Sequence, residues 1–376
     1  MRPHAKFGLR AAPRGGLFAA VLAGSVPLLG GCSSAPVAPP APVPKAAPAP
    51  PPSVVPSATP TATAEASASV APPPAPEPPP KPPVPPPNFE APYPKTAQDG
   101  DGVWEPLVKG PEGQPALLYK AIVHPHPSKK PIYAAIVAID LTRTEVQLVA
   151  GTEEPETKTV AESKRTGLVP SSALEDLLVV MNGGFMAKHG KYGMMLDGEE
   201  FLTPREDACA VAKRKDGSFW IAPWIEMKGK NDSLAFYRQT PQCLVDKGTL
   251  HADLDSEEKR RKWGGQNNGQ KDTRRSAMGI DASGKVLFYG LGEWVFPKDI
   301  AVAMKAAGAV SAAELDINWS YTRFLLMGRP TPSDPVQVTS TLVPKIEHSK
   351  RGYVEKAATR DFFYVTRKKP AKAPTP

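Results

Sequence analysis

Acidic and amide side chains alternate with apolar ones in a short segment of the C-terminal half, residues 313–320. Glu314, Asp316 and Asn318 are separated by single apolar residues. If this segment is a strand, alternation places the three polar side chains on one face and the apolar ones on the other. Neighbouring side chains on such a face are about 6.6 Å apart, which is twice the rise per residue.

Two carboxyl groups on one ridge suit general acid and base catalysis. At a glycosidic bond, this chemistry requires a pair of carboxyl groups several ångströms apart with different preferences for the proton. A nearby like charge is one way to raise the pKa of Asp316 or Glu314. A solvent-facing polar strand is the alternative interpretation, but the apolar flanking sequence favours burial in a cleft.

A second segment, residues 274–281, carries an arginine among small residues. Strand alternation places Arg275, Ala277 and Gly279 on one face and the residues between them on the other. The small side chains leave room, and a guanidinium group holds phosphate or carboxylate through a fork of donors. We therefore expect an anionic ligand beside Arg275; a solvated arginine at a sheet edge is the alternative.

A third segment ends an apolar run with Asn182-Gly183-Gly184-Phe185. Two glycines allow backbone N–H groups to approach a ligand closely and to converge on an anion. Asn-Gly-Gly is also an ordinary turn sequence. The segment alone therefore does not distinguish a binding loop from a structural turn.

The order of the three segments resembles the phosphodiester glycosidase family, that is, N-acetylglucosamine-1-phosphodiester alpha-N-acetylglucosaminidase-like domains. A Pro-x-Cys-Leu-Val-Asp-Lys-Gly segment at residues 241–248 and a predicted hairpin and helix stand at the positions where the family has them. The resemblance covers roughly residues 132–365. It implies that the chain has the fold of this family and is a hydrolase that cleaves the sugar–phosphate bond of a glycosyl phosphodiester.

The resemblance also implies roles for individual residues. Asp316 matches the aspartate of the family's Leu-Asp-Gly-Gly-Gly-Ser motif and is the expected acid/base or electrostatic stabiliser, with Glu314 as its partner. The residues expected to bind the substrate or its phosphate are Asn182, Gly183, Gly184, Arg275, Asn318, Trp319 and Ser320.

The chain departs from the family at Ile317, Asn318 and Trp319, where the family usually has glycines. A backbone nest for phosphate is hard to build from a β-branched residue and an indole. Either the substrate is held differently, for instance by Trp319 stacking on a sugar, or the activity has been lost. The alternative function is therefore a non-catalytic glycan-binding lipoprotein on the same scaffold, and a third is a tethered interaction module.

We expect neither a cofactor nor a metal site. His124 and His126 alternate in a proline-rich segment and could face one ligand, but two imidazoles do not complete a zinc site.

Apolar and β-branched runs with turn signals between them predict the strands that position these residues. The runs are residues 132–139, 146–150, 177–181, 209–212, 219–222, 276–280, 286–289 and 324–327. A helix is predicted over residues 297–307, since Pro297 suits a first helical turn and Gly308 suits the exit. A second helix is expected over residues 171–177. The expected fold class is α+β, a single β-rich mixed α/β domain.

The N-terminus has the pattern of a bacterial lipoprotein signal peptide. Basic residues precede the apolar run 16–29, which is too short to span a membrane but suits a signal-peptide core. Leu-Gly-Gly-Cys32 then resembles a lipobox, so residues 1–31 are the expected signal peptide and Cys32 the expected lipidation site. An ordinary secretory signal is the alternative. Ser33 after the cysteine favours the outer membrane, and we expect a lipid-anchored protein of the bacterial cell envelope.

Residues 32–95 are expected to be a lipidated, proline- and alanine-rich disordered linker. Of the 47 prolines in the chain, 25 lie between Ser33 and Pro94. Such a composition offers too little large apolar surface to offset the conformational entropy of ordering the chain. The phosphodiester glycosidase-like domain is then expected at residues 96–367, and a basic disordered tail at residues 368–376.

The charge argues against a nucleic-acid partner. The formal net charge is +8, but 7 of the 46 basic and 3 of the 38 acidic residues lie in residues 1–95, and 4 more basic residues follow residue 366. The middle of the chain therefore holds 35 residues of each sign. Because the excess lies at the two ends rather than on a domain face, we expect a glycan or glycosyl-phosphate partner and a membrane contact through the lipid only.

Cys209 and Cys243 remain after Cys32 is assigned to lipidation. A disulfide is permitted in the oxidising envelope, and the strand-like sequence around both residues is equally typical of two buried free thiols.

Overall fold

Several apolar runs of the chain form strands that are buried on both faces. The computed structural model describes residues 84–265 and 272–369, and strands are present at all eight predicted positions. Along β3 (Ala134–Asp140), Val137 and Ile139 contribute to one hydrophobic cluster, whereas Ile136 and Ala138 contribute to another. Burial on both faces explains why such strands read as continuous apolar runs.

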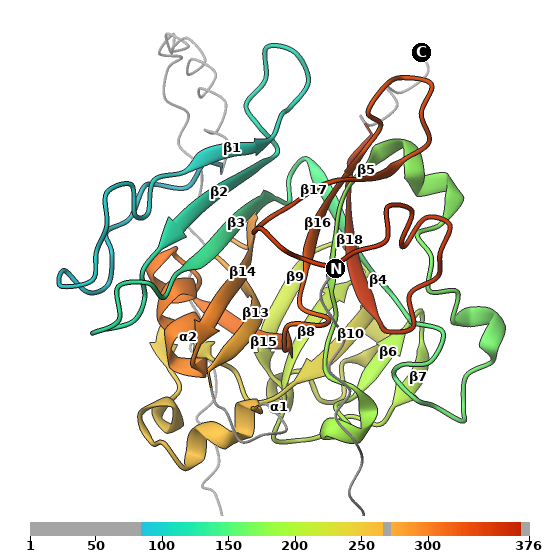
Figure 1. The fold of residues 1–376 in the computed structure, drawn as a ribbon. Helices are drawn as coiled ribbons and strands as arrows, with labels where there is room; N and C mark the ends of the chain where they lie inside the picture. The colour runs from blue at the N-terminus through green and yellow to red at the C-terminus, as the bar shows by residue number, and fades with distance from the viewer. Residues whose placement is uncertain (1–83, 266–271, 370–376) are drawn as a thin grey trace, which may run out of the picture. The chain divides into compact units, whose positions relative to one another are not determined.

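The largest sheet has eight strands and carries the longer helix on one face (Figure 1). Its order is β1 (Glu105–Val108), β2 (Leu118–Val123), β3, β14 (Val286–Val295), β13 (Thr273–Ile280), β15 (Ser311–Ile317), β11 (Val245–Asp246) and β12 (Thr249–Leu250). Helix α2 (Pro297–Ala306) packs on this sheet through Ile300, Ala303 and Met304. The predicted helix at this position is confirmed.

Two five-stranded sheets complete the domain. The second sheet has the order β7 (Glu199–Leu202), β6 (Met194–Leu196), β10 (Leu234–Thr240), β8 (Cys209–Arg214) and β9 (Phe219–Pro223). The third has the order β17 (Gln337–Thr341), β16 (Phe324–Gly328), β5 (Leu177–Asn182), β18 (Phe362–Arg367) and β4 (Thr144–Val149). The last strand of the described chain thus lies between two early ones.

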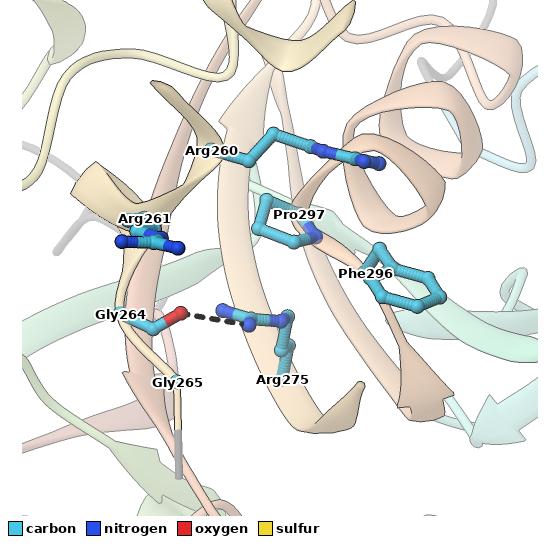
Figure 2. Close-up of a pocket in the computed structure, with 7 residues that line it drawn as sticks. All are labelled: Arg260, Arg261, Gly264, Gly265, Arg275, Phe296 and Pro297. Carbon is cyan, nitrogen blue, oxygen red and sulfur yellow. Dashed lines mark hydrogen bonds between the residues drawn. The ribbon is translucent and has the colours of Figure 1, made fainter. Parts of the chain in front are cut away.

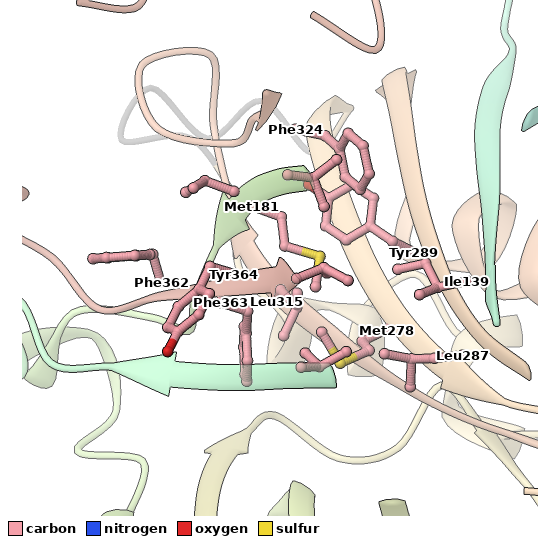
Figure 3. Close-up of a cluster of buried hydrophobic side chains, with 14 of the residues drawn as sticks. Ile139, Met181, Met278, Leu287, Tyr289, Leu315, Phe324, Phe362, Phe363 and Tyr364 are labelled. Carbon is pink, nitrogen blue, oxygen red and sulfur yellow. The ribbon is translucent and has the colours of Figure 1, made fainter. Parts of the chain in front are cut away.

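The main hydrophobic core takes side chains from all three sheets, and Figure 3 shows a part of it that comes from the first and third. Leu287 and Tyr289 of β14 meet Phe324 of β16 and Phe363 of β18 in this cluster. Tyr289 and Phe324 contact directly, with ring centroids 5.1 Å apart. This core fixes the ends of β5, β13 and β15, which carry the three motifs.

The expected α+β class is wrong, because the domain is built from three antiparallel sheets. Within residues 84–265 and 272–369, the α-helices are α2 and the four-residue α1 (Trp224–Met227). The helix expected over residues 171–177 is a 3-10 helix, η2 (Ser171–Asp176), which follows Pro170 and buries no residue. One ten-residue helix does not form a layer of its own. The other 3-10 helices are η1 (Glu162–Lys164), η3 (Ala187–His189), η4 (Asn231–Ser233), η5 (Ala252–Asp255) and η6 (Lys259–Trp263).

Packing begins before residue 96, the expected start of the domain. Val84 is completely buried, and the ring of Phe89 lies 5.6 Å from that of Trp104. Trp104 also donates its indole N–H to the carbonyl of Pro87 at 3.1 Å. The last residues of the predicted linker therefore belong to the folded part, where Phe89 packs against Trp104 of the domain.

Cys209 and Cys243 form a disulfide. The bond joins the start of β8 to the segment that leads into β11, so it links the second sheet to the first. Since the two cysteines are separated by 34 residues, cross-linking restricts the unfolded chain and stabilises the fold by about 2–4 kcal/mol.

Candidate active site

A cavity of about 250 Å³ at the end of β15 contains one of the two expected catalytic residues, Asp316. Its walls come from the turn after β5, from η3, from η6 and from β15. The lining residues are Phe185, His189, Tyr192, Pro241, Arg261, Lys262, Gly264, Gly265, Asp316, Ile317 and Asn318. A buried carboxyl group thus shares one cavity with guanidinium, ammonium, imidazole and phenol groups.

Asp316 is held by one cation and one backbone amide. Its Oδ1 accepts a hydrogen bond from the N–H of Ile317 at 2.9 Å, and its Oδ2 is bound by Nη1 of Arg360. The residue is 2% exposed, and burial raises its pKa to about 7, although Arg360 favours the charged form. A carboxyl group with this pKa is populated in both protonation states near neutral pH, as acid/base chemistry requires.

An irregularity in β15 turns Asp316 away from Glu314. Glu314 pairs with Ala277 and Ile317 pairs with Arg275, so three steps along β15 match two along β13. Such a bulge interrupts the alternation of side chains. Glu314 and Ile317 therefore share the face of Arg275, and the predicted ridge of Glu314, Asp316 and Asn318 is not formed.

Glu314 lies behind the cavity wall rather than in it. Its Oε1 accepts a hydrogen bond from Arg275 at 2.9 Å, and its Oε2 has no hydrogen-bond partner within the described residues. The side chain is completely buried, which raises its pKa to about 7; the charge of Asp316 raises it as well, while Arg275 lowers it. The charge of Asp316 thus affects the pKa of Glu314, but Glu314 does not line the cavity that contains Asp316.

The donors of Arg275 are bound to protein acceptors. Nη1 donates to the carbonyl of Trp263 at 2.7 Å as well as to Glu314, and Nη2 donates to the carbonyl of Gly264 at 3.0 Å. Arg275 therefore fastens the segment after η6 to β13. The space expected beside the small residues of this face is filled by α2, since a methyl group on Gly279 would lie 2.9 Å from Cε of Met304.

A second cavity, of about 400 Å³, shares the segment after η6 with the first, since Gly264 and Gly265 line both (Figure 2). Arg260, Arg261 and Arg275 line it, together with Gly264, Gly265, Phe296 and Pro297. Arg261 lines both cavities, is exposed, and has no carboxylate partner in the described part of the chain. The two cavities therefore share one available cation.

The backbone N–H groups of the Asn-Gly-Gly turn are already bound to Asp361, whose carboxylate accepts from Gly184 and whose backbone carbonyl accepts from Gly183. Gly184 donates its N–H to Oδ2 of Asp361 at 2.9 Å, and Gly183 donates to the carbonyl of the same residue at 3.1 Å. Arg238 donates to Asp361 at 2.9 Å and is itself completely buried. A side chain on Gly184 would collide with Arg238, because its Cβ would lie 2.7 Å from Cζ of Arg238.

Asn182 is a buried connector between sheets. Its Nδ2 donates to Oγ of Ser276 at 2.9 Å, and its Oδ1 accepts the hydroxyl of Tyr289 at 2.7 Å. Asn182, Gly183 and Gly184 are thus brought close to the β13–β15 pair, as the motif order predicts, but their polar groups point into the protein rather than into the cavity.

The three residues after Ile317 have separate positions. Asn318 lines the cavity of Asp316 and adopts a left-handed backbone conformation with φ of 84°. Trp319 lies outside this set of lining residues and packs on Arg274. Ser320 is exposed, and its carbonyl accepts a hydrogen bond from Arg323.

Four residues of this region were not found from the sequence: Arg360, Asp361, Arg238 and Tyr192. Arg360 and Asp361 directly precede β18, and Arg238 lies within β10. A charged residue in the middle of an apolar strand run, as at Arg238, is a signal for a buried ion pair. Arg360 and Asp361 had no comparable signal, since they stand in a mixed-charge stretch.

The remaining sequence expectations concern a metal site, a membrane-spanning segment and the N-terminal anchor. Within the described residues, no cluster of three or more His, Cys, Asp or Glu side chains is placed to hold a metal ion. His124 binds Asp101 at 2.7 Å through Nδ1. The described residues contain no helix with the length and apolarity that crossing a bilayer requires. Cys32, the signal peptide and most of the linker lie outside the described residues.

Comparison with solved structures finds distant similarities. The catalytic domain of zebrafish N-acetylglucosamine-1-phosphodiester alpha-N-acetylglucosaminidase, auto-inhibited by its pro-peptide, matches with a TM-score of 0.43 and 15% identity over 71% of this chain and 88% of that one. A hypothetical protein from Synechocystis matches at 0.35 and 11%, over 67% and 62% of the two chains. A putative exported protein from Burkholderia pseudomallei matches at 0.32 and 11%, over 62% and 74%.

No family model matches the chain, and no curated protein matches it. At this level of similarity, the structural matches establish neither a family nor an activity.

Proposed function

We propose that the domain is a hydrolase that cleaves the bond between a sugar and a phosphate in a glycosyl phosphodiester. The observation that carries the proposal is Asp316, a buried carboxyl group with a pKa of about 7 that lines a cavity of suitable size for a sugar. The motif order described above supports the same chemistry.

Asp316 acts as the proton donor. Its protonated form gives a proton to the phosphate oxygen that leaves the anomeric carbon, and the carbon–oxygen bond breaks. Water supplies the oxygen that binds the anomeric carbon, and the proton released from water restores the acid. The carboxylate of Asp361 favours the protonated form of Asp316, and Glu314 is coupled to Asp316 from behind the wall, since the charge of Asp316 raises the pKa of Glu314.

Arg261 holds the phosphate. The donors first expected to do so, at Gly183, Gly184 and Arg275, bind Asp361, Glu314 and backbone carbonyls instead. Arg261 lines the cavity of Asp316, and a guanidinium without a carboxylate partner is suited to a phosphodiester. The neighbouring Lys262 is already paired with Asp253 at 2.6 Å.

The direct test is an assay of the purified domain with alkyl esters of sugar 1-phosphates. Appearance of free reducing sugar that depends on Asp316 supports the proposal. Binding of these esters without any product would instead support a non-catalytic glycan-binding protein. If the esters neither bind nor react, both the hydrolase and the glycan-binding hypothesis are excluded.

The pH dependence of activity should respond to Arg360. The Arg360 cation lowers the pKa of Asp316, so Arg360→Met should raise this pKa above about 7. Since the proton donor must be protonated, kcat/KM of the parent falls as the pH rises through about 7, and the fall should move to higher pH in the variant. Arg329→Met, which removes an exposed cation paired with Glu175, is the control and should leave the profile in place. An unshifted profile in Arg360→Met would exclude Asp316 as the group that titrates.

We also propose, from the sequence, that the domain is anchored to the bacterial outer membrane through a lipid on Cys32. Metabolic labelling of expressing cells with an alkyne fatty acid should mark the full-length chain and should be lost in Cys32→Ser. Equal labelling of the two chains would refute the anchor without bearing on the activity of the domain.

A further inference from the structure

Two tryptophans, Trp294 exposed and Trp319 half-buried, form an aromatic pair beside the cavity of Asp316. Trp294 and Trp319 have ring centroids 4.6 Å apart and planes at 54°. Trp294 is 49% exposed, which is unusual for a large apolar side chain in the described part of the domain. Trp319 follows Asn318, which lines the cavity, but is not itself among the residues that line it. The pair therefore lies next to the cavity rather than within it.

The backbone presents Trp294 through a conformation that rarely carries a side chain. Val295 pairs with Thr273 and Gly292 pairs with Arg275, so β14 contains one residue more than β13 at this point. Trp294 lies in this bulge with φ of 58°, a left-handed conformation in which glycine is the usual residue. Strain of this kind persists where the surroundings enforce it, and such positions cluster at binding and active sites.

A chain of polar side chains that begins at the buried Arg274 supports Trp319. Arg274 is 3% exposed, and its guanidinium carbon lies 4.6 Å from the ring centroid of Trp319. Arg274 also donates to Oε1 of Glu293 at 2.5 Å, and Tyr133 donates to Oε2 of the same carboxylate at 3.3 Å. Arg274 and its partners thus hold the ring of Trp319 in place, whereas the ring of Trp294 is half exposed to solvent.

We propose that Trp294 and Trp319 bind a sugar ring of a glycan chain, next to the sugar that enters the cavity of Asp316. The C–H bonds on one face of a pyranose carry partial positive charge and pack against the negative face of an indole. Because the pair lies outside the cavity, one sugar does not fill both places. Building on the proposed function, the substrate class is then an oligosaccharide or polysaccharide that carries the phosphodiester.

The test separates sugar binding from turnover by working in the Asp316→Asn chain. Calorimetric titration with chitotetraose, cellotetraose, maltotetraose and mannotetraose should detect binding of at least one tetrasaccharide. Trp294→Gly should weaken that binding by about tenfold, the contribution of one aromatic contact. Because glycine suits the bulge, this variant should unfold at the same temperature or a higher one, which excludes misfolding as the cause. Ile225→Ala, which alters another exposed apolar residue, is the control and should bind as the parent does.

Three results would overturn the proposal. They are no binding of any tetrasaccharide, equal binding by the Trp294→Gly chain, and a Trp294-dependent affinity for AMP in place of the sugars. Each of these results leaves the hydrolase proposal standing, because turnover is measured separately. That assay uses the parent protein, which retains Asp316, and short alkyl esters of sugar 1-phosphates. Conversely, absence of turnover together with Trp294-dependent binding would retain the sugar site and reject the hydrolase.

Discussion

Asp316→Asn should lower the rate of glycosyl phosphodiester hydrolysis by a factor of about 10²–10⁴, the range supplied by a positioned proton donor. The amide keeps the shape of the carboxyl group and loses only the proton that it exchanges. Release of free sugar, measured at saturating substrate near pH 7, checks the prediction. Asp232→Asn, at an exposed position in η4, is the matched control and should keep the parental rate. Full activity of Asp316→Asn would remove this residue from the mechanism.

The same variant should change how stability depends on pH. The pKa of Asp316 is about 7 in the folded chain and near its ordinary value of 3.8 in the unfolded chain. The protonated carboxyl therefore contributes stability that is present below about pH 4 and is lost as the pH rises through 7. Asn does not titrate, so the unfolding temperature of the variant relative to the parent should be higher at pH 8 than at pH 5. A difference independent of pH would contradict the raised pKa.

Asp361→Ala should lower the free energy of unfolding by about 3–5 kcal/mol, the usual cost of leaving a buried charge without its partner. Arg238 is completely buried and loses its carboxylate, and Gly184 loses the acceptor of its N–H. Urea unfolding followed by fluorescence measures the change. Glu206→Gln breaks an exposed pair with Lys228 and should cost less than about 1 kcal/mol.

A second variant tests whether the cost arises from the pair itself. The double variant Arg238→Met/Asp361→Leu removes both charges. It should therefore lose less free energy of unfolding than the sum of the losses in Arg238→Met and Asp361→Leu alone. Additive costs, or a loss below about 1 kcal/mol in Asp361→Ala, would show that the pair does not hold the turn. The glycines would then be available to a ligand after all.

Local patterns predicted the strands well, because most residues of each apolar run are buried in a sheet, and several of these strands are buried on both faces. They also predicted helix α2, where Pro297 and Gly308 mark both ends. The class was missed because residues 171–176 form a 3-10 helix in place of a second α-helix, and Ala173 and Leu174 of this segment are only partly buried against the core. The extra residue in β15 was missed because alternation assumes regular pairing, and pairing depends on β13, which is distant in the sequence.

The candidate site was predicted only in part, because sequence patterns describe residues within one segment and not their partners in distant segments. Asp316 and Asn318 do line one cavity, and Asn182 does lie against β13, as the order of the motifs indicates. The occupants of the glycine turn were not predictable, because Asp361 lies 177 residues beyond Gly184 in the chain. No local spacing links two such residues, and only the packing of the third sheet brings them together.

The position of β18 bears on how the protein is made. This strand lies between β5 and β4, yet it is among the last parts of the described chain to be synthesised. The two early strands cannot complete their sheet until β18 inserts, and contacts of such long sequence separation form slowly. Arg360 and Asp361 arrive with this strand, so a nascent chain that already carries Asp316 lacks both groups. The cavity of Asp316 is therefore assembled only when translation of the domain is nearly complete, and chains shortened before β18 lack part of its surroundings.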